Sequence, residues 1–123
     1  MDEPVPQLSA ENGAGKILLR GLIDWVSLAE ARWLVSLAEP GTPAEVREAT
    51  LRAITLLVEH DLVRLGETTP RFEPWRLSQE DGLQRVRREW SDPEQELRPG
   101  NIVWLDNTPA GDDVARAIDA ARS

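Results

Sequence analysis

Four signals for the start of a helix divide this 123-residue chain into short segments. Each begins with a Ser or Thr, whose hydroxyl accepts a hydrogen bond from a free backbone N–H of the first helical turn, and an acidic residue follows it in or near that turn. The four positions are Ser27, Thr42, Ser78 and Thr108. They predict four helices, of which the first ends near residue 38 before a Pro-Gly pair and the second near residue 60.

Apolar residues outside these segments predict one more helix and two strands. A stripe at helical spacing begins after Lys16 and includes Ile17, Leu18, Gly21, Leu22, Trp25 and Val26. Residues 62–65 and 102–105 predict the strands. Residues 72–75 predict an extended stretch at a sheet edge or in a loop, because Pro74 has no N–H to donate. Residues 1–15, rich in Pro, Gly and acids, predict a flexible tail.

The order of these elements predicts the fold class. Three helices, a strand, an excursion with a helix, a second strand and a final helix indicate a mostly helical α+β domain over residues 16–123. Its two strands are expected to form a short antiparallel ribbon around a three-helix core. Residues 67–100 then form an insertion between the ribbon strands.

Residues 42–67 resemble the recognition helix and first wing strand of winged helix-turn-helix regulators, the GntR type especially. The matching pieces are Val46-Arg47-Glu48-Ala49 and His60-Asp61-Leu62-Val63. Residues 104–111 resemble the second wing strand and the turn that follows it, and residues 72–90 with this strand resemble small uncharacterised actinobacterial proteins. The winged-helix resemblance implies a domain that reads DNA through the helix at 42–60, with Arg47, Arg52 and Arg64 as its contacts, and it is compatible with a homodimer.

Charge argues against a nucleic-acid partner. The whole chain has a formal net charge of −8, and residues 16–67 hold six basic against eight acidic residues. Phosphate contacts by Lys and Arg dominate the affinity of DNA-binding proteins, so an acidic core is poorly suited to this role. Anionic membranes are disfavoured for the same reason.

The five Trp residues fall into two groups. Trp25, Trp33 and Trp104 are expected in the core, since large aromatics stabilise small domains. Trp75 and Trp90 lie in the insertion, where an exposed aromatic suits an interface hot spot. The predicted partner-binding set in this insertion combines aromatic and basic side chains: Phe72, Trp75, Arg85, Arg87, Arg88 and Trp90.

The sequence gives no sign of catalysis or of a cofactor. Cys is absent, and His60 is the single imidazole, expected as a cap at a helix end rather than a metal ligand. No nucleophile, base and acid set or phosphate-binding loop is visible, and Asp112-Asp113 fits the N-terminal charge of a helix. No apolar run approaches the about 20 residues needed to span a bilayer. The acidic N-terminus is unlike a signal peptide, so we expect a cytoplasmic protein.

These observations favour a non-enzymatic protein that acts through protein–protein contact. Its acidic surface fits a basic partner, as in an inhibitor or immunity-type protein, because complementary charge speeds encounter and narrows partner choice. The alternative is a winged-helix transcriptional regulator. We expect no metal and no cofactor in either case.

Overall fold

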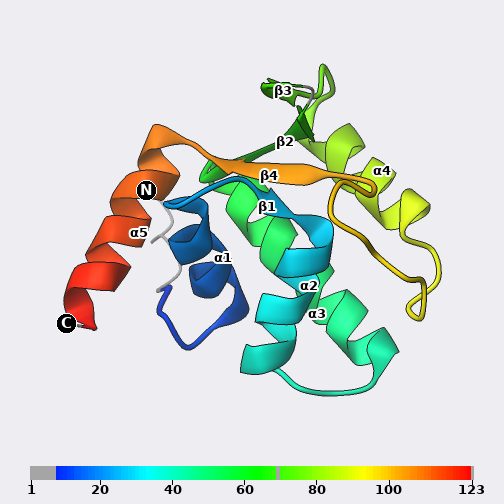
Figure 1. The fold of residues 1–123 in the computed structure, drawn as a ribbon, viewed down its shortest axis with the longest axis horizontal. Coiled ribbons are helices and arrows are strands. Elements are labelled where there is room, and N and C mark those ends of the chain that lie inside the picture. The colour runs from blue at the N-terminus through cyan, green and yellow to red at the C-terminus, as the bar shows by residue number, and fades with distance from the viewer. Residues whose placement is uncertain (1–7, 69, 123) are drawn as a thin grey trace, which may run out of the picture.

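The computed structural model describes residues 8–68 and 70–122, which form five helices and a four-stranded antiparallel sheet (Figure 1). The helices are α1 (Gly13–Gly21), α2 (Leu28–Ala38), α3 (Pro43–Glu59), α4 (Gln79–Glu89) and α5 (Pro109–Ala121). The strands are β1 (Val26–Ser27), β2 (Val63–Thr68), β3 (Phe72–Pro74) and β4 (Trp104–Asn107). The α+β prediction is therefore confirmed.

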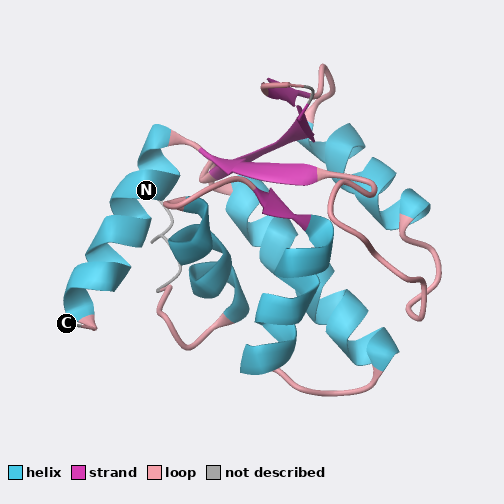
Figure 2. Ribbon diagram, in the orientation of Figure 1, coloured by secondary structure: helices cyan, strands magenta, loops and turns pink. Residues whose placement is uncertain are grey.

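The helices cover one side of the sheet, whose strand order is β1-β4-β2-β3 (Figure 2). Within this layer α1 and α2 pack together and α3 contacts both of them, while α5 lies against α1 and α4 against α3. The strand pairs place Leu105 opposite both Leu65 and Val26, so that three apolar side chains from three strands meet the helices. The buried core thus lies between the sheet and α1, α2 and α3.

All four predicted helix caps are confirmed. The side chains of Ser27, Thr42, Ser78 and Thr108 each accept a hydrogen bond from the backbone N–H three residues on. At Thr42 the reciprocal bond is also present, because the Glu45 carboxylate accepts from the Thr42 backbone N–H at 3.0 Å. These caps satisfy donors that the first turn of a helix otherwise leaves free.

The first helix differs from its prediction at both ends. It begins at Gly13, inside the segment expected to be a flexible tail, because Asn12 caps it by accepting from the Gly15 N–H at 2.8 Å. A side chain at Gly15 would place its Cβ 1.8 Å from the Ser9 carbonyl oxygen, so glycine allows this close approach. Residues 1–7 of the predicted tail lie outside the described residues.

The helix then ends at Gly21, and Trp25 and Val26 are not on its stripe as predicted. Val26 is in β1 instead, paired with β4. The buried Asn107 side chain donates from Nδ2 to the Leu18 carbonyl oxygen at 3.0 Å, and it occupies the space beside Gly21. The last turn of α1 therefore packs against Asn107 of β4, at the point where the helix ends.

The two predicted ribbon strands are present as the antiparallel pair β2–β4, but they form the centre of a four-stranded sheet. The sequence predicts only a two-stranded ribbon, because a strand of two residues such as β1 is too short to show the alternating pattern of a strand. The predicted extended stretch at residues 72–75 is the edge strand β3, in agreement with the restriction that Pro74 imposes. No helix in the described residues has the length and apolar character needed to cross a membrane.

The predicted positions of the tryptophans are largely wrong. Trp33 is 57% exposed on α2, while Trp25 and Trp104 are half-buried rather than core residues. Trp90, predicted to meet a partner, is fully buried. The reason for Trp33 lies in the phase of α2, whose inner face is formed by Leu28, Ala31, Leu34 and Val35.

Candidate functional site

The insertion between β2 and β4 carries the predicted partner-binding residues, but they do not form one surface. Trp90 is 0% exposed, and its indole N–H has no acceptor among the described residues. It ends α4, and its backbone N–H donates to the Val86 carbonyl. Because its side chain belongs to the core, Trp90 is removed from the candidate binding residues.

Phe72 and Trp75 face different neighbours. The Phe72 ring lies 6.2 Å from the Trp25 ring and 5.3 Å from the Arg64 guanidinium. The Trp75 ring instead lies 4.0 Å from the Arg85 guanidinium of α4, and it packs partly against the core. These aromatic residues fasten β3 to the sheet and to α4, rather than forming a shared exposed patch.

The three predicted arginines of α4 also separate. Arg85 stacks on Trp75 and its Nε donates to Glu89 at 2.7 Å. Arg87 contacts Glu48 of α3 at 3.2 Å, and Arg88 is exposed. Two of the three guanidiniums therefore engage the domain itself.

One of the arginines expected to contact DNA, Arg47, also engages the domain itself. Arg47 is 12% exposed in its side chain, and it donates to the carbonyl oxygens of Trp90 at 2.7 Å and of Arg87 at 3.1 Å. It also donates to Glu48 at 2.8 Å. Arg47 thus binds the C-terminal end of α4, where free carbonyls favour a cation.

Arg52 and Arg64 remain exposed, but they lie on different elements. Arg52 of α3 is 3.8 Å from Glu39 at the end of α2. Arg64 of β2 pairs across the strands with Asp106 of β4. The structure does not bring the three predicted DNA-contacting arginines together.

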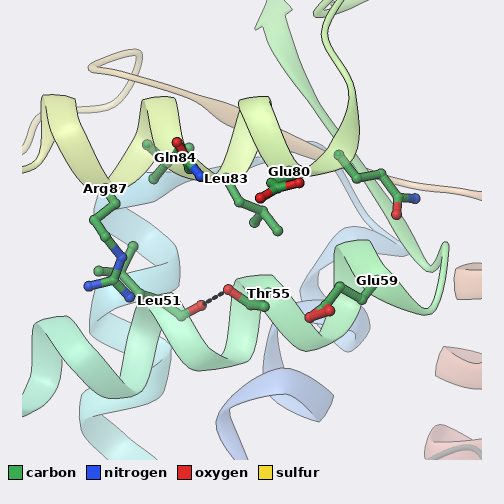
Figure 3. Close-up of a pocket in the computed structure, with 9 residues that line it drawn as sticks. Leu51, Thr55, Glu59, Glu80, Leu83, Gln84 and Arg87 are labelled. Carbon is green, nitrogen blue, oxygen red and sulfur yellow. Dashed lines mark hydrogen bonds between the residues drawn. The ribbon is translucent and has the colours of Figure 1, made fainter.

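A groove of about 430 Å³ lies between α3 and α4 (Figure 3). Leu83 of α4 points toward α3 across it, and the carboxylates of Glu59 and Glu80 lie at one end. The Thr55 hydroxyl is already used, because it donates to the Leu51 carbonyl at 2.7 Å. The hollow between α3 and α4 is therefore partly apolar, with Glu59 and Arg87 toward its opposite ends.

Among the residues that the structure describes, four large apolar side chains are exposed elsewhere: Ile23, Trp33, Leu37 and Leu77. Trp33 and Leu37 are one turn apart on α2 and so share a face. The sequence contains a signal for this pair that the predicted core position of Trp33 overlooks. Placing Leu28, Ala31, Leu34 and Val35 inward turns residues 33 and 37 outward together.

The cap of α3 changes the acidity of a carboxyl group beside it. Hydrogen bonds from the backbone N–H of Thr42 and with its side chain lower the pKa of Glu45 below its ordinary value. Glu45 is exposed at the start of α3 and stays ionised at neutral pH. Within the part of the chain that the structure describes, His, Asp and Glu residues do not gather into a group of three that could hold a metal.

Comparison of the chain with protein-family models, with curated proteins and with solved structures finds no match.

Proposed function

We propose that this chain is a winged-helix-like, non-enzymatic domain that binds a basic protein partner. The element order supports the winged-helix part. Helices α1, α2 and α3 with strands β1, β2 and β4 follow the helix, strand, helix, helix, strand, strand order of that fold, and the three strands pair in the order β1-β4-β2. In this interpretation β3 and α4 stand where the wing would be.

The position of Arg47 is the observation that supports a protein partner over DNA. In a winged-helix regulator the third helix must offer basic or amide side chains to the major groove. Here Arg47 binds the end of α4, and Glu48 is shared between Arg47 and Arg87. The inserted helix thus uses Arg47, one of the two arginines that the third helix would offer to DNA.

The charge that remains outward on α3 is acidic. Its side chains Glu45 and Glu59 are exposed against an exposed Arg52, whereas Glu48 is paired with Arg47 and Arg87. Such a face repels phosphate and attracts a cationic surface. With the net charge of −8, this favours a basic protein over a nucleic acid.

DNA binding is the second candidate, favoured by two side chains. Arg52 is 66% and Arg64 50% exposed, and their ion pairs with Glu39 and Asp106 are open to exchange for phosphate. Exposed ion pairs of this kind contribute only about 0–1 kcal/mol, so they are easily broken.

Two measurements test the proposal together. Fluorescence anisotropy with a labelled mixed-sequence duplex at low salt should show no binding, and selection from an unbiased displayed-peptide library should enrich peptides of positive net charge. Salt-sensitive duplex binding that disappears in Arg52→Glu and Arg64→Glu would establish the second candidate instead. Enrichment of acidic peptides would contradict the proposal that the partner protein is basic.

A further inference from the structure

The outer face of α2 holds two exposed apolar side chains. Trp33 is 57% and Leu37 54% exposed, and their spacing of four residues places them on one face. Tryptophan is the residue type most enriched at the energetic centres of protein interfaces. Leaving both side chains in water is unfavourable for the isolated domain, since burying such apolar surface contributes about 25 cal/mol per Å².

Beside Trp33 lies a groove of about 520 Å³, formed by α2, the start of α3 and the loop that follows α4. Its lining is mainly small or apolar on the helix side and polar on the loop side: Ala29, Arg32, Trp33, Ser36, Gly41, Pro43, Val46, Pro93, Glu94, Gln95 and Glu96. Arg32 donates from Nη1 to the Gln95 carbonyl at 3.1 Å, which holds the loop against α2. The groove is therefore already formed in the free domain.

Carboxylates lie along the loop side of this groove and at the turn near it. Glu94 and Glu96 are exposed on the loop that lines the groove, with Glu96 in an exposed ion pair with Arg98. Glu39 and Glu45 are exposed at the turn between α2 and α3, where they line the neighbouring hollow. The last turn of α2 has no basic residue, so the negative end of that helix adds to the same field. The charge of Arg32, in contrast, is directed at a carbonyl of the loop.

We infer that this Trp33 groove binds a basic amphipathic segment of the partner protein, which places its apolar side chains on Trp33 and Leu37 and its Lys or Arg residues against the rim carboxylates. Helices of this kind commonly lie in a groove with an apolar floor. A second copy of the chain would bring its own charge of −8 to an acidic rim and fits poorly. The inference rests on the proposed protein-binding function and gives it a location.

The test uses isothermal titration calorimetry of the full chain with a short amphipathic helix made of leucine and lysine. We expect binding that Trp33→Ala weakens about tenfold or more, as for an interface hot spot. Leu37→Ala should weaken it less, and a Glu94→Gln, Glu96→Gln double variant should reduce its dependence on salt. Ile23→Ala is the matched control, because it removes an exposed apolar side chain from the segment between α1 and β1, outside the groove lining.

The outcomes separate the location from the function. Equal binding by wild type and Trp33→Ala, or no binding of the leucine–lysine helix at all, overturns the Trp33 groove, whereas the proposed function is decided by the duplex and library measurements. Equally tight binding of a leucine–glutamate helix overturns the basic character of the segment. Circular dichroism of each variant confirms that it is folded.

Discussion

Two helical surfaces of this domain differ in how they are covered: one, on α3, packs against α4, and the other, on α2, is exposed to solvent. The start of α3 is held against the C-terminal end of α4 by Arg47 and by the ion pair between Glu48 and Arg87, and Trp90 is buried there. The outer face of α2 instead leaves Trp33 and Leu37 in solvent. The difference between them is that the insertion packs against the third helix, whereas these exposed apolar side chains lie on the second helix, where we propose that the partner binds.

Two tryptophan variants give the largest contrast between these surfaces. Trp90→Ala removes a fully buried side chain and should lower the free energy of unfolding by about 3–5 kcal/mol. Trp33→Ala should change it by no more than about 0.5 kcal/mol, because the side chain is mostly in water already. Urea denaturation measures both, and similar losses from the two variants would end the distinction.

The next contrast compares two arginines of α3. Arg47→Met leaves the carbonyls of Trp90 and Arg87 without their guanidinium donor and should cost about 1–3 kcal/mol of stability. Arg52→Met removes a solvent-exposed pair with Glu39 and should cost about 0–1 kcal/mol. Chemical denaturation of the two variants provides the comparison, and an Arg47→Met protein as stable as wild type would show that this side of α3 is not locked by α4.

A smaller effect of opposite sign is expected within α4. Gly82 lies inside the helix, and a Cβ there would meet Leu65 at 3.5 Å and Trp75 at 3.8 Å, which are ordinary contacts. Gly82→Ala should therefore stabilise the domain by about 0.5–1 kcal/mol through reduced freedom of the unfolded chain. Thermal unfolding measures it. A lower melting temperature of Gly82→Ala would mean that α4 has no room for the added methyl group. Gly15→Ala is the destabilising counterpart, because its Cβ would lie 1.8 Å from the Ser9 carbonyl oxygen.

The smallest effect concerns the acidic rim beside α2. Because hydrogen bonds with Thr42 lower the pKa of Glu45 in the folded state, its carboxylate adds stability above the pKa of the unfolded chain. That contribution is lost as the pH falls through the lower folded pKa. The stability difference between wild type and Glu45→Gln should therefore shrink in acid, and a carbon-detected NMR titration should place the folded pKa of Glu45 below that of the unfolded chain. A difference that grows in acid would contradict this sign.

Local signals predicted most of the fold. The caps at Ser27, Thr42, Ser78 and Thr108 depend on side chains within one turn, so the sequence alone was sufficient to find them. The strand β1 was missed because its two residues are extended only through pairing with β4, which lies far along the chain.

The candidate site was predicted less well for the same reason. The sequence around Trp90 and Trp33 does not distinguish a buried from an exposed tryptophan, because the burial of each depends on which helices pack together. In the sequence Arg47 resembles a DNA-contacting residue of a recognition helix. In the structure the C-terminal end of α4 packs against the start of α3 and accepts the hydrogen bonds of Arg47. The outward face of α2, however, follows from the phase of its apolar residues, and that signal was available in the sequence.

Chemical-shift mapping on the nitrogen-15-labelled chain compares the two surfaces directly. One sample is titrated with a mixed-sequence duplex at low salt and a second with the leucine–lysine helix. We predict that the duplex leaves the spectrum unchanged, and that the helix shifts the Trp33 indole signal together with amides of α2 and of the Pro93–Glu96 loop. Shifts along α3 and β2 on adding the duplex, with α2 unaffected by the peptide, would contradict the proposed protein-binding function and its location.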